Sequence, residues 1–389
     1  MGDRLAPVAE WLARDGRLVR RPASFLEQLM QRIQAVGIPV WRAYIGLQLI
    51  HPQLQAMGFM WRRGEPVQEI ARRYGIQFTP AYIGSPMQAA REQGKTVRHR
   101  LDEITDADHI VLHELKAEGG IDYLAMPMRI RRDGPVPVMT FATDSRPGFT
   151  DEDVADLARL VDLIGAIVEM HIEHSVAETV ANTYLGHQVG NRVLNGMIRR
   201  GEGEEINAVL WFSDLRDFTG MNERMPAGEM LDLLNNYLQL VGDALAANGG
   251  EILKFIGDGV MAYFPAEDAL FLPIVTGQAV AAARRLIGDV AAANEARAAA
   301  GREPVRFGVG LHVGPVTFGN VGTEDRLDFT VIGPAVNRAS RLEGLTKALG
   351  VPVCASAEFN DACMVSLKSL GKHRLRGIPQ PAEIFTLPD

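Results

Sequence analysis

The sequence contains little cysteine and no long uncharged apolar run, and each absence argues against a class of protein. Only Cys354 and Cys363 occur among the 389 residues, and their spacing is neither that of a metal-binding pair nor that of a redox motif. We therefore expect two ordinary thiols in a reducing compartment. The most apolar stretch, residues 271–293, is interrupted by two arginines and an aspartate, so it predicts a packed helix and not a membrane span.

An excess of positive charge is also missing. The formal net charge of -8 at pH 7 argues against a general nucleic-acid binder, which presents a basic face or tail. The arginines near the N-terminus precede no apolar run, so no signal peptide is expected. These features predict a cytoplasmic protein without nucleic-acid or membrane partners, and its length suits two domains.

The first 150 residues mix helical and strand patterns. Apolar residues at helical spacing predict a helix over residues 25–36, and residues 40–49 have the composition of a strand. Two apolar runs, residues 123–130 and 136–142, flank the sequence R-R-D-G-P. Such a turn sequence between two apolar runs predicts a β-hairpin.

The end of this region resembles a GAF sensory domain. The resemblance is carried by Y-L-A-M-P-M, a D-G turn, a second strand and G-F-T-D-E-D-V before a long helix. Thr150 is the expected N-cap of that helix, with Asp153 in its first turn. The resemblance implies a GAF-like α/β sensory domain over residues 1–150. It also implies an unidentified small-molecule effector beneath the hairpin of residues 123–142.

The long helix is expected to continue into a signalling segment and linker over residues 151–203. Its apolar residues with a 4-3-4 spacing are Leu157, Val161, Ile164 and Val168. This spacing suits the pairing of two parallel chains. The alternative is an amphipathic helix that packs only on its own domain. Gly186 and Gly190 are expected to loosen the helix further along.

From residue 206 the pattern changes to alternating strands and helices. A helix is expected over residues 227–247, an alanine-rich helix up to about residue 300, and another helix from Pro334, which a short strand and a further helix follow. The expected strands cover residues 206–212, 251–257, 260–264, 305–313, 316–321, 327–332, 369–375 and 382–387. This order predicts an α+β domain over residues 204–389, built on a largely antiparallel sheet.

Two aspartates in this domain are candidates for metal binding. Asp214 lies in F-S-D-L-R-D-F-T, just after a buried strand, and Asp258 lies in K-F-I-G-D-G, at the tip of a hairpin. If the two strands are neighbours, the carboxylates converge. Two such charges about 4 Å apart repel by about 4 kcal/mol at an effective dielectric constant near 20. Convergence would therefore indicate divalent cations between them.

A third motif, D-F-T-V-I-G-P-A-V-N-R-A-S-R, carries an amide and a guanidinium. Asn337 and Arg341 are four residues apart, so they share one face of a helix. A planar guanidinium that is always charged suits a phosphate whose charge builds up during a reaction. Outside such a motif, the same residues would be an ordinary surface asparagine and a salt-bridged arginine.

In order and composition, the three motifs resemble the catalytic domain of class III nucleotidyl cyclases, which has a ferredoxin-like antiparallel sheet with helices. The resemblance implies that Asp214 and Asp258 hold two Mg²⁺ or Mn²⁺ ions per active site. It further implies that Asn337 orients the substrate and that Arg341 stabilises the pentavalent phosphorus. Arg376 matches a position, usually lysine, that contacts the triphosphate.

The resemblance also assigns the residues that recognise the base. Lys254 matches the lysine that donates to adenine N1, and Thr330 matches the residue that accepts from the adenine N6 amine. Guanylyl cyclases have glutamate and cysteine at these positions, so this pair favours ATP. Phe218 and Thr219, in the first motif, are further candidates for substrate binding. Asp217, between the metal aspartate and these residues, departs from the family, in which glycine is common.

The resemblance thus implies conversion of ATP to 3′,5′-cyclic AMP and pyrophosphate, at sites shared within a head-to-tail homodimer. Two alternatives remain. One is a guanylate cyclase, which Lys254 and Thr330 disfavour. The other is a sensor whose output domain only dimerises and binds nucleotide, which the complete set of catalytic residues disfavours.

Overall fold

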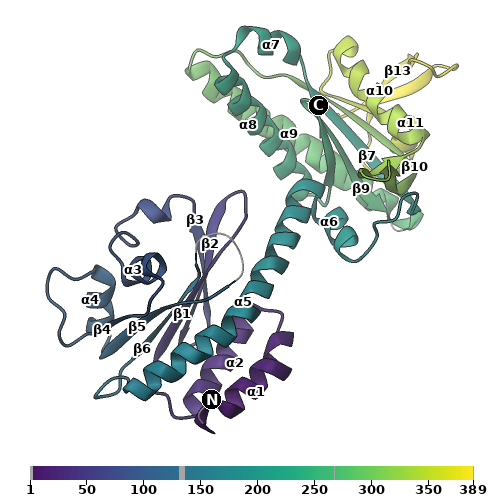
Figure 1. Ribbon diagram of the computed structural model, residues 1–389. Coiled ribbons are helices and arrows are strands. Elements are labelled where there is room, and N and C mark those ends of the chain that lie inside the picture. Colours follow the sequence, from purple (N-terminus) through teal and green to yellow (C-terminus); the bar gives the residue numbers. More distant parts are fainter. Residues whose placement is uncertain (1–2, 131–135, 267, 389) are drawn as a thin grey trace. The chain divides into compact units, whose positions relative to one another are not determined.

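The chain folds into two compact units, divided between Thr183 and Tyr184. The computed structural model describes residues 3–130, 136–266 and 268–388, and Figure 1 shows the elements of each unit. Helix α5 (Asp151–Leu185) belongs almost entirely to the N-terminal unit.

The N-terminal unit is built on a six-stranded antiparallel sheet with the order β3-β2-β1-β6-β5-β4. The strands are β1 (Arg42–Gln48), β2 (Leu54–Arg62), β3 (Gln68–Arg73), β4 (Val97–Arg100), β5 (Asp122–Pro127) and β6 (Val138–Thr143). The other helices are α1 (Ala6–Arg14), α2 (Pro22–Ala35), α3 (Pro86–Gln93) and α4 (Ile110–Ala117), with a short helix η3 (Ile76–Phe78).

The two faces of this sheet are covered by different helices. Ala43, Ile45 and Leu47, alternate residues of β1, are buried in the larger core with residues of α1, α2 and α5. A smaller core joins α3 and α4 to the opposite face. Because alternate residues of a strand point to opposite faces, each strand contributes to both layers. Figure 1 shows α1, α2 and α5 on one side of the sheet and α3 and α4 on the other.

The predicted hairpin of the N-terminal unit is present as β5 and β6, which pair antiparallel from Asp122–Thr143 to Pro127–Val138. The predicted turn sequence R-R-D-G-P, residues 131–135, lies outside the described residues. The helix that follows begins as expected. The hydroxyl of Thr150 accepts from the Asp153 amide at 3.1 Å, and the Asp153 carboxylate accepts from the Thr150 amide at 2.9 Å. This reciprocal pair satisfies two amides at the helix start.

The apolar stripe of α5 does not have the role that we favoured. The stripe residues Leu157, Val161, Ile164 and Val168 are at most 2% exposed and lie in the core of their own unit. The expectation that this stripe pairs two chains is therefore wrong, because the sheet of the same unit already covers it. Gly186, with φ of 83°, ends the helix, whereas Gly190 lies inside α6 (His187–Leu194) and does not interrupt it.

The C-terminal unit contains an eight-stranded sheet with the order β13-β14-β12-β10-β7-β9-β8, and β11 pairs with β10. The strands are β7 (Gly203–Leu215), β8 (Glu251–Ile256), β9 (Gly259–Ala266), β10 (Phe307–Gly322), β11 (Leu327–Ile332), β12 (Val353–Ser356), β13 (Lys368–His373) and β14 (Ala382–Thr386). The helices besides α6 are α7 (Phe218–Arg224), α8 (Ala227–Ala246), α9 (Leu272–Ala299), α10 (Pro334–Leu349) and α11 (Ala357–Ala362).

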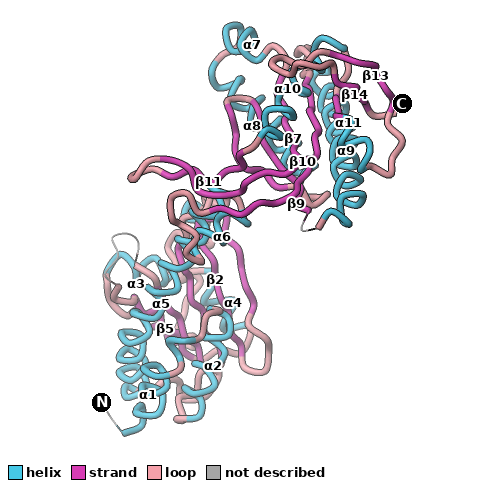
Figure 2. The backbone as a smooth tube through the Cα atoms, turned by 90° about the vertical axis from the view of Figure 1, so that its right-hand side faces the viewer, coloured by secondary structure: helices cyan, strands magenta, loops and turns pink. Residues whose placement is uncertain are grey.

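Two features of this sheet differ from the expectation. The sheet is largely antiparallel, as expected, but it contains one parallel pair, because α10 crosses over and returns the chain into β12, which lies parallel to β10. Residues 305–313 and 316–321, expected as two strands, form the single strand β10, which pairs with β7 through Pro315. The end of β10 and β11 form a two-stranded arm, visible in Figure 2.

Helices α8 and α9 cover one face of the sheet, and α6 and the start of α10 cover the other. Among the described residues, the segment Ala269–Ala299 is long and apolar enough to cross a membrane by length and composition alone. Its side chains Ala279, Ala283 and Leu286 are fully buried in the core between α8 and the sheet. This packing accounts for the apolar residues on the buried face of α9.

Candidate active site

The structure brings Asp214 and Asp258 together. Asp214 lies near the end of β7, and Asp258 lies in the turn between β8 and β9. Strand β9 pairs with β7 up to Val260, so the turn lies next to the end of β7. The two carboxyl groups are in hydrogen-bonding contact. Burial, followed by this contact with Asp258, raises the pKa of Asp214 to about 8.

The environment of Asp214 fits a divalent cation. Its Oδ1 atom is buried and has no hydrogen-bond partner within the part of the chain that the structure describes. A cation would supply a partner for this oxygen and neutralise the repulsion with Asp258. The described residues contain no group of three or more histidine, cysteine or acidic side chains arranged for a metal. A two-carboxylate site suits Mg²⁺, which takes its other ligands from water and substrate phosphates.

A third acid, Glu343, lies close to this pair and was missed from the sequence. Its charge contributes to the raised pKa of Asp214, and burial raises its own pKa, against the charge of Arg216. Glu343 is on α10, which lies directly on β10. A Cβ atom added to Gly308 would lie 2.8 Å from Glu343 Oε1. The alternating glycines at 308 and 310 were the available sequence signal, since strand glycines mark a close approach.

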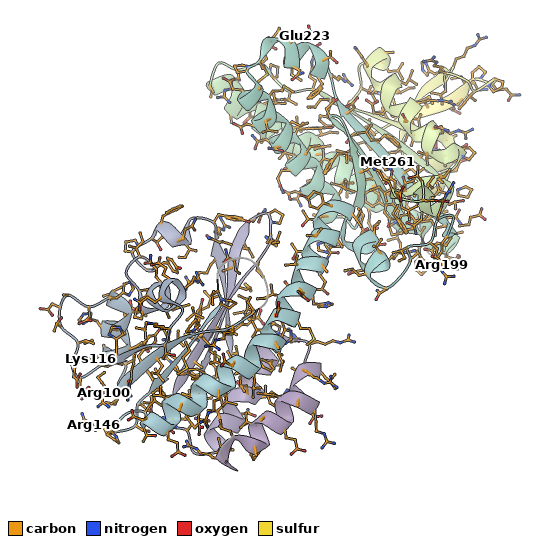
Figure 3. The ribbon with its side chains drawn as sticks, viewed as in Figure 1. Arg100, Lys116, Arg146, Arg199, Glu223 and Met261 are labelled. Carbon is orange, nitrogen blue, oxygen red and sulfur yellow. The ribbon has the colours of Figure 1, made fainter. Side chains whose placement is uncertain are left out.

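Lys254, on β8, contacts the face of β11 that also carries Thr330. The β8–β9 ladder has a bulge before Lys254, which pairs in register with Met261, labelled in Figure 3. The Lys254 ammonium forms an ion pair with the carboxylate of Asp328. Asp328 and Thr330 are alternate residues of β11, so they share a face, while Phe329 between them is buried on the other. Sequence reasoning did not identify Asp328 as the partner of Lys254.

Asn337 and Arg341 lie in the first turns of α10. Asn337 is exposed and Arg341 is half-buried. A Cβ atom added to Gly377 would lie 3.3 Å from Arg341 Nη2, so the guanidinium lies beside the turn that carries the exposed Arg376. In the described residues, no carboxylate lies within 4.0 Å of the Arg341 guanidinium. The guanidinium therefore remains able to bind an external anion.

The structure explains the departure at Asp217. Its φ is 64°, which makes it the one non-glycine residue with positive φ in the described ranges. Glycine adopts this left-handed conformation without strain, and aspartate tolerates it better than most residues. The Asp217 carboxylate accepts from Arg224 at 2.9 Å, which lowers its pKa. The Asp217 carboxylate is thus bound to a residue of α7, the helix on which Figure 3 labels Glu223.

The two substrate candidates next to Asp217 lie in the first turn of α7. Phe218 is half-buried and packs against the core, whereas Thr219 is exposed. Six of the predicted site residues thus fall into three groups of contacts, to which Asn337, Phe218 and Thr219 do not belong. These are the Asp214–Asp258 pair, the Lys254–Asp328 pair with Thr330, and Arg341 with the turn at Arg376.

Comparison with known proteins identifies the C-terminal unit. Residues 203–388 match the family described as adenylate and guanylate cyclase catalytic domain. The chain is 34% identical over 186 residues to adenylate cyclase 1 of Rhizobium meliloti (strain 1021), which is 47% of this chain and 27% of that protein. It is 34% identical over 253 residues to an adenylate cyclase of Anabaena cylindrica, which is 59% of this chain and 49% of that protein.

Among solved structures, the adenylyl cyclase CyaB from P. aeruginosa is 29% identical, with a TM-score of 0.44. The match covers 48% of this chain and 96% of that one. The chain spans less than half the length of the two curated relatives, and the family match does not extend into the N-terminal unit. Residues 203–388 are a class III adenylate/guanylate cyclase catalytic domain.

Proposed function

We propose that the protein is an adenylate cyclase, which converts ATP to 3′,5′-cyclic AMP and pyrophosphate. The observation that carries the proposal is the contact between Asp214 and Asp258. The raised pKa of Asp214 and its buried, unpartnered Oδ1 atom indicate that a cation binds here. Such a site in a nucleotidyl cyclase domain is suited to chemistry on a nucleoside triphosphate. The two relatives described above are both named adenylate cyclases, which supports ATP as the substrate.

In this proposal, Asp214 and Asp258 hold two Mg²⁺ or Mn²⁺ ions. When bound, these ions activate the ribose 3′-hydroxyl and neutralise the leaving pyrophosphate. Asn337 orients the ribose, and Arg341 stabilises the charge on the α-phosphorus as the 3′-oxygen attacks. Arg376 binds the triphosphate, and Phe218 and Thr219 contact the substrate. No covalent intermediate with the protein is needed, since positioning and charge stabilisation suffice.

The base is recognised by Lys254 and Thr330. The lysine donates a hydrogen bond to adenine N1, and the threonine accepts one from the N6 amine. Guanine presents the opposite donor and acceptor at these positions. A mismatch at one such hydrogen bond costs roughly 1–3 kcal/mol, which favours ATP without excluding GTP.

The active site is completed by a second chain in a head-to-tail homodimer. Within one chain, the metal-binding pair and the Lys254 group belong to separate sets of contacts. Phe255 and Ile256, on the edge strand β8, are 54% and 53% exposed, and Ile332 at the end of β11 is also exposed. Exposed apolar side chains on an edge strand suit a protein interface.

We further propose that residues 1–150 are a GAF-like sensory domain that controls the cyclase through the segment of residues 151–203. The buried stripe of α5 cannot pair two chains, but a second apolar stripe is exposed. The residues of this exposed seam are Leu163, Ala166, Met170, Ala177 and Val180. Their spacing of 3, 4, 7 and 3 follows the a and d positions of a heptad repeat. The exposed seam therefore suits pairing with a second copy of α5.

The deciding experiment is a turnover assay with ATP and with GTP, each in the presence of magnesium or manganese. Formation of cyclic AMP from ATP supports the proposal. A preference for GTP would instead identify a guanylate cyclase. Nucleotide binding without turnover under all four conditions would mean that the output domain is not catalytic.

A further inference from the structure

The N-terminal unit contains a cavity of about 200 Å³ next to β1. Its β1 wall consists of Arg42, Tyr44, Gly46 and Gln48. These are alternate residues, so they form the face of β1 opposite to the core with α1, α2 and α5. Other parts of the wall come from η3, α3, α4 and the neighbouring strands. The cavity is more than ten times larger than the roughly 10–15 Å³ that one water needs.

The charges of the cavity wall all have one sign. Arg42, Arg72 and Arg91 line the cavity, and no lining residue is an aspartate or glutamate. Within the described ranges, none of the three guanidinium groups has a carboxylate within 4.0 Å. Acids outside the wall act on Arg42 from beyond 4.0 Å, and the one with the larger effect, Glu118, is already paired with Arg62 at 2.6 Å. Three arginines around one cavity without an acid are an unfavourable arrangement unless an anion joins them.

The three arginines retain N–H donors that no described residue accepts. Arg42 donates from Nε and Nη2 to the sulfur of Met60, at 3.3 and 3.1 Å, and a thioether is a weak acceptor. Arg91 donates to the carbonyl of Val136 and to the Tyr82 hydroxyl. The Arg72 side chain has no hydrogen-bond partner in the described part of the chain. Since each guanidinium carries five N–H groups, donors remain for a ligand.

Two amides of the cavity wall also lack partners. The Oε1 atoms of Gln55 and Gln77 are buried without a hydrogen bond among the described residues. Buried polar atoms are normally satisfied, so these amides indicate a ligand with hydrogen-bonding groups of its own. Ile76, Met87 and Val111 add an apolar part to the same wall. The cavity therefore combines positive charge, neutral amides and an apolar surface.

We propose that this cavity binds a small organic anion, whose carboxylate or phosphate group is held by Arg42, Arg72 and Arg91. The guanidinium fork matches the oxygens of both groups. Gln55 and Gln77 bond to polar groups on the body of the ligand. The assignment of this anion as the effector of the cyclase rests on the proposed function, whereas the binding itself does not.

Binding is tested by calorimetry on the full chain at constant ionic strength. Benzoate and phenyl phosphate are the anionic probes, and benzamide and phenol are their neutral counterparts. The proposal expects at least one anion to bind more tightly than its neutral counterpart, and the preferred probe identifies a carboxylate or a phosphate ligand. It is overturned if neither anion binds at millimolar concentration, or if the neutral compounds bind equally well.

The site is tested with Arg72→Gln, because the Arg72 side chain makes no hydrogen bond to any of the described residues. Its matched control is Arg73→Gln, which removes an exposed charge from the next residue of β3. We expect at least tenfold weaker anion binding in Arg72→Gln and unchanged binding in Arg73→Gln. Equal weakening in both variants would show a general charge effect and overturn the site. Arg42→Gln provides a second test, with thermal unfolding to verify that the variant is folded.

The effector role is tested separately, by turnover with and without the probe that binds. A change in turnover that is absent in Arg72→Gln supports regulation through the cavity. Binding without any change in the turnover of an active enzyme would overturn the effector role. Calorimetry does not require turnover, so an inactive cyclase with an intact anion site would contradict only the proposed function.

Discussion

The two units each concentrate charge of one sign without its counterpart, but they do so in different ways. The N-terminal unit gathers Arg42, Arg72 and Arg91 around a cavity that is lined by its own sheet and helices. The C-terminal unit places Asp214 against Asp258 at the end of a strand. The arginine cavity is formed by one chain, whereas the proposed cyclase site needs residues from two. One unit is therefore suited to binding a ligand alone, and the other makes activity depend on how two chains meet.

The largest effect is expected from removing the carboxylates of the C-terminal unit. Asp214→Ala or Asp258→Ala should lower turnover by roughly a hundredfold to a thousandfold or more, since charge stabilisation at the reacting phosphate is lost. Turnover with magnesium or manganese measures this. The control is Asp217→Gly, which removes a nearby carboxylate that binds Arg224 and suits the left-handed backbone. Full activity in both alanine variants would exclude these residues as metal ligands.

The difference between a site formed by one chain and a site shared by two chains is tested by mixing two inactive proteins. A heterodimer of Asp214→Ala and Arg341→Ala has one site with both defects and one intact site. If subunits exchange freely, half of the dimers are heterodimers, so about a quarter of the wild-type activity should return. Subunit exchange is verified with differently tagged chains. Exchange without recovered activity would show that each chain carries a complete site.

Base recognition is expected to give the next largest effect. Replacing Lys254 by Glu and Thr330 by Cys together should lower the ratio of ATP to GTP turnover by about 10–200-fold, because both hydrogen-bonding groups are reversed. Separate kcat and KM values for each nucleotide measure the change. Asp328→Asn is the control, since it removes the ion pair with Lys254 but leaves both base-contacting groups. An unchanged ratio in the double variant would mean that other residues select the base.

A smaller effect is expected from changing the phase of α5 between the two units. Inserting one residue after Ala181 rotates the following helix by about 100°, whereas seven residues preserve the heptad phase. If the exposed seam pairs two chains, the first insertion should change basal turnover several-fold and the second should change it less. Equal turnover for both insertions and for a chain without residues 1–150 would show that α5 is a passive connection.

The sequence predicted contacts within hairpins and motifs better than contacts between distant elements. The Asp214–Asp258 contact followed from one strand and one turn, both with clear patterns. Glu343 and Asp328 were missed, because their positions depend on how α10 and β11 pack onto the rest of the sheet. The stripe at Leu157 and Val161 was misassigned, because a helix on its own sheet and a helix in a coiled coil have similar apolar spacing. Only burial separates these two cases.

The parallel pairing of β12 was missed for a similar reason. The sequence showed a helix from Pro334 and a short strand after it, but not which neighbour that strand would take. A crossover helix permits a parallel neighbour, and β12 pairs with β10 at Val309 and Val353. Residues 305–313 and 316–321 were expected as two strands, yet the β10–β7 register continues through Pro315, opposite Asn207. The parallel neighbour of β12 and the continuity of β10 thus depend on pairing between distant strands, which local sequence patterns do not show.

The smallest predicted effect concerns the pH dependence of stability without metal. The pKa of Asp214 is raised from its ordinary value of 3.8 to about 8, so the folded protein holds a proton that the unfolded chain releases between these values. This group therefore contributes stability at low pH that is lost as the pH rises towards 8. Thermal unfolding in the presence of EDTA should show Asp214→Asn gaining melting temperature relative to the wild type between pH 5 and 8. Added Mg²⁺ should stabilise the wild type most at high pH, where the carboxylate is free to bind it. A difference between the two proteins that does not vary with pH would show that Asp214 is already ionised in the metal-free state.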